Sequence, residues 1–133
     1  MPDIYSRSFL LAVILAVLAS IPASADDIMT EVIITVQDDA ILAFSAYKSE
    51  WVAEDLKLSE IVVSKQSKGN GGTVITSKRI LGFSALANRW RSVTLRMNEQ
   101  VNEMIVEGNA ATVRTNMRIF GFSAHTGRWI EGP

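Results

Sequence analysis

Trp51, Trp90 and Trp129 lie 39 residues apart in the sequence, a spacing that puts one indole ring on each of three repeated units. An exposed aromatic ring offers a flat surface on which a sugar ring can stack, and one such ring per unit is the arrangement of a multivalent lectin. Large aromatic side chains also build hydrophobic cores. The spacing alone therefore leaves two interpretations open: sugar-stacking platforms, or rings packed between units.

Arginines recur as two pairs at the same spacing, close to the second and third tryptophans. Guanidinium groups bind carboxylates and other acidic groups through paired hydrogen bonds. The first unit carries Ala40 and Glu50 at the corresponding positions, so an arginine site would repeat only twice. The alternative interpretation places each arginine on a solvated edge. The predicted ligand-binding residues are Trp51, Trp90, Trp129, Arg79, Arg89, Arg118 and Arg128.

The side chains that catalysis and metal binding require are scarce in this chain. His125 is the single histidine, in a predicted turn before Thr126-Gly127, and there is no cysteine. Acidic residues occur as sequence neighbours, such as Glu54-Asp55, and neighbours in a strand point to opposite faces. A glycosidase needs two carboxylates that converge across a cleft. We therefore predict no catalytic residue, no metal site, no cofactor and no enzymatic activity, with a carbohydrate-acting enzyme as the least favoured class.

A Phe-Ser-Ala motif recurs in register with the tryptophans. It is Ala-Phe-Ser-Ala at residues 43–46 and Gly-Phe-Ser-Ala at residues 82–85 and 121–124, each time with the Trp seven residues after the Phe. A period of this length indicates repeated supersecondary units stacked against one another. We place the units at about residues 26–56, 57–95 and 96–133.

Each unit is predicted to contain four short antiparallel strands. In the second unit they span about residues 59–65, 73–77, 79–85 and 89–95, which are rich in Val, Ile and Thr and often alternate apolar with polar residues. The glycine-rich segment 69–72 lacks the Lys-Ser/Thr of a phosphate loop and is predicted to be a turn. Only the stretch from residue 95 to 106 leaves helix and strand both open. The fold class is therefore predicted to be all-β.

The Phe and Trp of each motif are predicted to face each other across a hairpin. A turn centred on Leu86-Ala87 sets Phe83 opposite Trp90, and the same count applies in the other two units. Cross-strand aromatic pairs contribute about 0.2–1 kcal/mol and help to fix the register. Gly82 and Gly121 lie inside predicted strands, where glycine indicates close backbone approach or room for a neighbouring ring.

The third copy of the motif, residues 121–129, resembles the end of a blade in quinoprotein-type β-propellers. Those blades show Ala-x-Asp-x-x-Thr-Gly followed by a Trp that docks between blades. Here Gly121 stands at the Ala, Ser123 stands at the Asp, and Thr126-Gly127 match. The Trp comes earlier than in those blades, and the second copy has Ala87-Asn88 in place of Thr-Gly. The resemblance implies blade-like units, without a quinone cofactor.

Two architectures use four-stranded units of about 40 residues, the β-propeller and the β-trefoil. A trefoil closes with three units. The segment that corresponds to the first strand of the first unit lies at about residues 20–27, beside the N-terminal leader described next, which leaves eleven strands. Propellers have about 4–8 blades, so three blades would either form half of a ring completed by a second copy or be a remnant of a longer repeat protein. Propeller-like blades are the first interpretation and a trefoil is the alternative.

The first 25 residues have the pattern of a cleavable signal peptide. Arg7 supplies the positive charge, residues 9–19 form an apolar segment too short to span a membrane, and residues 23–25 form a small-residue cleavage site. We therefore predict cleavage at Ala25-Asp26 and export to the periplasm or the exterior. The processed chain, residues 26–133, is predicted to be a single all-β repeat domain with no membrane anchor.

Charge is nearly balanced in total and uneven along the chain. Residues 26–60 carry nine acidic and two basic side chains, whereas residues 61–133 carry four acidic and ten basic ones. Complementary charge patches guide association, so this distribution suits a homodimer formed head to tail. A near-neutral exported protein is not expected to bind nucleic acid. The sequence predicts an exported, non-catalytic binding or scaffold module with a protein or glycan partner, and a lectin-like carbohydrate-binding protein as the alternative.

Overall fold

The computed structural model describes residues 29–133 as an all-β protein of eleven strands in three antiparallel sheets. The first sheet contains β1 (Val32–Gln37), β2 (Ala40–Ser45) and β3 (Glu50–Asp55). The second contains β4 (Val62–Lys68), β5 (Gly71–Thr76), β6 (Arg79–Ser84) and β7 (Arg89–Thr94). The third contains β8 (Val101–Glu107), β9 (Ala110–Thr115), β10 (Ile119–Ser123) and β11 (Arg128–Glu131).

The predicted signal peptide and the cleavage site at Ala25-Asp26 lie outside the described residues. Within residues 29–133 there is no helix of the length and apolar character needed to span a lipid bilayer.

Each sheet is a simple meander in which strands pair in chain order. The predicted strand number of eleven is confirmed, and the first sheet has no described counterpart of β4 and β8. Between residues 29 and 133, no strand pairs with a strand of another sheet. A β-trefoil needs pairing between units to close its barrel, so the trefoil alternative disagrees with the observed sheets.

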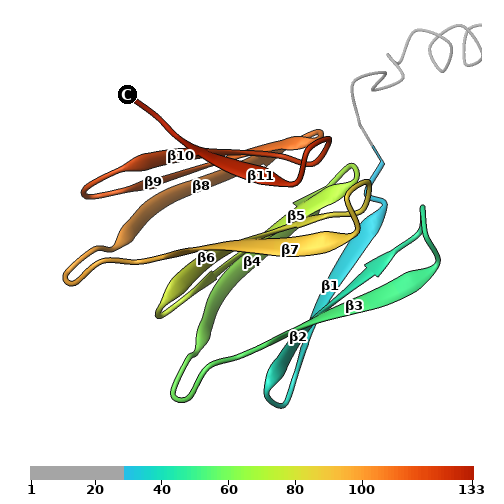
Figure 1. Ribbon diagram of the computed structural model, residues 1–133, viewed down its shortest axis with the longest axis horizontal. Coiled ribbons are helices and arrows are strands. Elements are labelled where there is room, and N and C mark those ends of the chain that lie inside the picture. Colours follow the sequence, from blue (N-terminus) through green and yellow to red (C-terminus); the bar gives the residue numbers. More distant parts are fainter. Residues whose placement is uncertain (1–28) are drawn as a thin grey trace, which may run out of the picture.

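The three sheets lie side by side, with the β4–β7 sheet between the other two (Figure 1). Corresponding strands are neighbours: β3 contacts β7, and β7 contacts β11. Two hydrophobic clusters fill the spaces between the sheets. The cluster between the first and second sheets consists of Val32, Ile34, Ile41, Ala43, Val74, Leu81, Phe83, Ala85 and Trp90. The cluster between the second and third sheets consists of Ile75, Ile80, Val113 and Phe120.

The middle sheet is covered on both faces, and every residue of β5 and β6 is buried. A strand that is covered on both faces needs apolar side chains on both, which explains the continuous runs Val74-Ile75 and Ile80-Leu81. In β9, by contrast, exposed and buried residues alternate strictly. The middle sheet therefore holds the core of the molecule together.

The predicted aromatic hairpins are confirmed in all three sheets. Phe44 pairs with Trp51, Phe83 with Trp90, and Phe122 with Trp129. The ring centroids lie 5.1, 5.2 and 4.9 Å apart, respectively. The turn between the paired strands needs a residue with positive φ, and this residue is Ser49, Asn88 or Gly127 in the three sheets. Glycine meets this requirement most easily, which accounts for the Thr-Gly of the third copy.

The start of the second sheet differs from the prediction. The strand expected from about residue 59 begins at Val62, because Ser59 has a φ of 63° and the chain turns back on itself there. The backbone N–H of Glu60 donates to the carbonyl of Lys57, and the Glu60 side chain accepts from the N–H of Lys57. The stretch 95–106, for which helix and strand were both open, contains a turn followed by strand β8, as at the start of the second sheet.

Candidate functional site: buried arginine bridges and a basic groove

Arg79, one of the predicted ligand-binding residues, is buried with 3% of its surface exposed. Its Nε donates to Glu60 Oε2 at 2.9 Å and its Nη2 donates to Glu60 Oε1 at 2.8 Å, which makes a two-pronged ion pair. Nη1 reaches Glu54 Oε1 at 3.0 Å, and Nη2 also donates to the carbonyl of Asp55 at 3.0 Å. The guanidinium therefore joins the turn before β4 to the end of β3 in the preceding sheet.

Arg118 repeats this arrangement in the third sheet. Its Nε donates to Glu99 Oε2 at 2.9 Å, its Nη2 pairs with Glu99 Oε1, and Nη2 also donates to the carbonyl of Thr94 at 3.2 Å. Glu60 and Glu99 were not among the residues predicted to be important. They lie 39 residues apart, so the repeat spacing was the signal that would have identified them. The first unit has Ala40 at the arginine position and lacks the bridge.

Both bridges lower the pKa of the buried carboxyl group. Burial raises the pKa of Glu60, but the hydrogen bonds from Arg79, the Lys57 N–H and Thr76 outweigh it, and the pKa falls to about 2. For Glu99, the hydrogen bond from Arg118 is the largest influence, and the pKa likewise falls to about 2. The same bonds raise the pKa of the two arginines. Each pair is therefore fully charged at neutral pH.

Acid should destabilise the protein over a range set by these two carboxyl groups. Their pKa is 4.5 without the fold and about 2 within it. Because the folded state binds these protons more weakly, the stabilisation is complete above about pH 4.5 and is lost as pH falls toward 2. Each group contributes up to ~3 kcal/mol. Urea unfolding followed by tryptophan fluorescence between about pH 6 and about pH 3 measures this effect. A free energy of unfolding that stays flat over that range contradicts the assignment.

The three predicted tryptophans have different environments. Trp90 is 8% exposed, and its indole Nε1 donates to the carbonyl of Val52 in the preceding sheet at 3.0 Å. Trp129 is half-buried, and its Nε1 donates to the carbonyl of Arg91 at 3.0 Å. Trp51 is 58% exposed. The first two rings therefore join neighbouring sheets, and only Trp51 presents most of its surface to solvent.

The other predicted residues come together at one place. Arg89, Arg128 and Trp129 line an open groove of about 430 Å³ between the edge strands β7 and β11. Arg91, which was not predicted, lines the same groove. Arg89 Nη2 donates to the carbonyl of Thr126 at 3.2 Å across the two sheets. The salt bridges formed within residues 29–133 use Arg79, Arg114 and Arg118, so none of the three groove arginines pairs with a carboxylate of the described chain.

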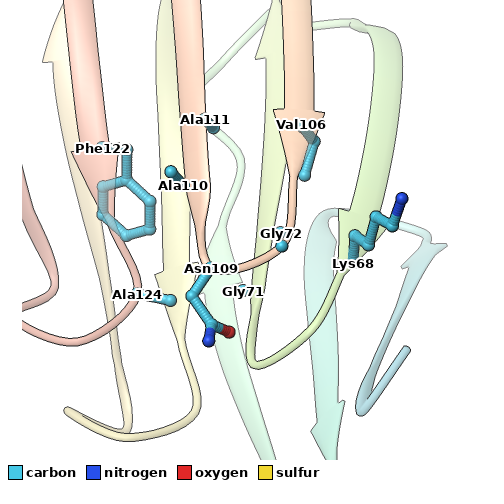
Figure 2. Close-up of a pocket in the computed structure, with 10 residues that line it drawn as sticks. Lys68, Gly71, Gly72, Val106, Asn109, Ala110, Ala111, Phe122 and Ala124 are labelled. Carbon is cyan, nitrogen blue, oxygen red and sulfur yellow. The ribbon is translucent and has the colours of Figure 1, made fainter. Parts of the chain in front are cut away.

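A second hollow lies between the middle and third sheets. Figure 2 shows its lining, which includes Gly71, Gly72, Phe122 and Ala124, and its volume is about 10 Å³. A single water molecule needs roughly 10–15 Å³ of such space, so this cavity is too small for an organic ligand.

His125 lies exposed in the turn between β10 and β11, where it was expected. Among the described residues, no group of three or more His, Asp or Glu side chains is placed to hold a metal ion. No protein-family model matches the chain, and comparison with curated proteins and with solved structures likewise found no match.

Proposed function

We propose that the protein is an exported, non-catalytic binding or scaffold module whose three sheets are propeller-like blades. Separate antiparallel meanders that pack face to face, with corresponding strands side by side, support this arrangement. The likeness of residues 121–129 to a quinoprotein blade end supports it further. In this proposal one blade is joined to the next by Trp90, Trp129, Arg79 and Arg118.

The basic groove between β7 and β11 is the observation that carries the binding role. Arg89, Arg91 and Arg128 line it, beside the ring of Trp129. Arginine side chains recognise carboxylates with good geometry and lose little entropy when they do so. We propose that this groove takes an acidic segment of a protein partner.

A labelled oligoglutamate peptide tests the groove. Replacing Arg89 and Arg91 together by glutamine should weaken its binding about tenfold, since each exposed charge pair is worth up to about 1 kcal/mol. Fluorescence anisotropy at low salt measures the change. The matched control removes two exposed charges elsewhere, with Lys48→Gln and Arg96→Gln, and should leave binding nearly unchanged. Equal weakening in both variants would show that peptide binding depends on net charge alone and would contradict the groove proposal.

The lectin alternative is favoured by one observation, the 58% exposure of Trp51. Stacking of a sugar ring on this indole would change its fluorescence. Titration with neutral and acidic oligosaccharides should leave the emission of the chain unchanged if the protein-binding proposal is right. Emission that changes with a sugar in the native chain and not in Trp51→Phe would replace that proposal with the lectin.

A further inference from the structure

The two interfaces between sheets use the same contacts at equivalent positions. Trp90 Nε1 donates to the carbonyl of Val52, and Trp129 Nε1 donates to the carbonyl of Arg91, both at 3.0 Å. Val52 and Arg91 are themselves 39 residues apart. Each of these Trp side chains therefore faces the preceding sheet. The carbonyl that accepts its hydrogen bond belongs to the residue that follows the Trp of that preceding sheet.

A ring-and-glycine contact accompanies this hydrogen bond. A Cβ atom added to Gly82 would lie 2.7 Å from the ring of Phe122, so the glycine makes room for the Phe of the next sheet. One interface earlier, Ala43 stands at the glycine position and belongs to the same hydrophobic cluster as Phe83. The small residue of each sheet thus receives the Phe of the sheet that follows.

Among the described residues, each outer face of the stack carries one side of this interface and has no sheet packed against it. The first sheet presents Trp51, 58% exposed, and Ile33, 60% exposed, beside a half-buried Phe44. The third sheet presents Ile130, 66% exposed, and Gly121, where an added Cβ would meet no atom within 4 Å. Gly121 and Ile130 line a largely apolar hollow of about 470 Å³ on the face that continues the stack.

We propose that these two faces bind each other reciprocally in a pair of copies: the first sheet of each copy docks on the third sheet of the other, which closes the pair into a ring. The 39-residue equivalence places Phe44 over Gly121 of the second copy and directs Trp51 Nε1 to the carbonyl of its Ile130. The proposed contact between copies uses the same residue positions as the contacts between sheets within one copy. The arginine bridge is absent from it because Ala40 stands at the arginine position.

Charge contributes little to this contact. Residues 29–56 carry six acidic side chains and one basic one. Residues 57–95 carry one acidic and seven basic side chains, and residues 96–133 carry four acidic and four basic ones. The strong charge contrast therefore lies between the first and second units, where Lys65 Nζ donates to the carbonyl of Ile34 at 2.7 Å and Arg79 pairs with Glu54. An apolar contact with one indole hydrogen bond should persist at high salt, which differs from an association driven by end-to-end charge.

Light scattering after size exclusion of the processed chain tests the proposal. The native chain should form dimers at both low and high salt. Gly121→Val should weaken dimerisation at least about thirtyfold, as expected when the pocket for a central aromatic anchor is filled. The melting temperature of the Gly121→Val monomer should equal that of the native chain at a concentration low enough to dissociate its dimer, because the added side chain starts in open space. The matched variant Gly82→Val should instead lower the melting temperature, since its Cβ meets Phe122 of the same chain.

Mixing two blocked variants distinguishes this contact from a symmetric one. Trp51→Glu blocks the first sheet and Gly121→Val blocks the third, so each variant alone should be monomeric. Together they should form a dimer through the one intact pair of faces, weaker than the native dimer. A native chain that is monomeric, or a dimer that Gly121→Val leaves intact, would overturn the proposal. The groove proposal is tested separately, by peptide binding to the Gly121→Val monomer.

Discussion

Replacing Arg79 by methionine should lower the free energy of unfolding by about 3–5 kcal/mol, the usual cost of removing one partner of a buried ion pair. The side chain of Glu60 has no exposed surface, so its carboxylate would lose two hydrogen bonds without gaining water in exchange. The link to Glu54 and to the Asp55 carbonyl in the preceding sheet would also disappear. Urea unfolding at neutral pH, followed by tryptophan fluorescence, measures the loss.

Two further variants show whether the unpaired charge is the cause. Arg118→Met should cost less, because Arg118 is more exposed than Arg79 and joins its neighbouring sheet through a single carbonyl. The double replacement Arg79→Met with Glu60→Leu should recover much of the stability, since an apolar pair of similar volume needs no partner. A loss below about 1 kcal/mol in the single Arg79 variant would mean that the bridge is not a structural element.

Replacing Phe83 by alanine should cost about 3–5 kcal/mol, as large-to-small changes of a fully buried aromatic residue do. Phe83 has no exposed surface, packs against Trp90, and belongs to the cluster between the first and second sheets. The cavity would lie at the centre of the molecule, where sheets on both sides limit its collapse. Thermal and urea unfolding would both report the loss.

The matched variant is Phe44→Ala, the same motif position in the first sheet. Phe44 is half-buried, and its ring lies on the outer face beside the exposed Trp51. The free energy of unfolding of the isolated monomer should fall by only about 1–2 kcal/mol. Equal losses for the two variants would contradict the placement of the first sheet at the end of the stack.

These contacts explain how a domain without disulfides is joined across its sheets. The chain has no cysteine, and its strands pair only within each sheet over residues 29–133. The links between sheets include the two hydrophobic clusters, the indole hydrogen bonds, the arginine bridges and the hydrogen bond from Lys65 to the Ile34 carbonyl. The repeated polar residues of this chain therefore serve mainly to fix one sheet against the next.

Local pattern was sufficient for the strands and for the hairpin pairing. The register of Phe83 against Trp90 follows from the number of residues between them, and the turn residues follow from the need for positive φ. Both depend on residues close together in sequence. For the same reason the all-β class and the eleven strands were predictable.

Only the tertiary structure decided which side chains are buried. The strand predicted from about residue 59 gave no sign that Glu60 is buried, because burying a carboxylate requires a partner, and that partner is 19 residues away. Trp51 and Trp90 share one motif, yet 58% of the first and 8% of the second is exposed. Their difference depends on whether another sheet lies against that face. A repeat in sequence specifies what each unit is, whereas the neighbours of a unit in space determine whether its aromatic and charged groups hold the fold together or meet a ligand.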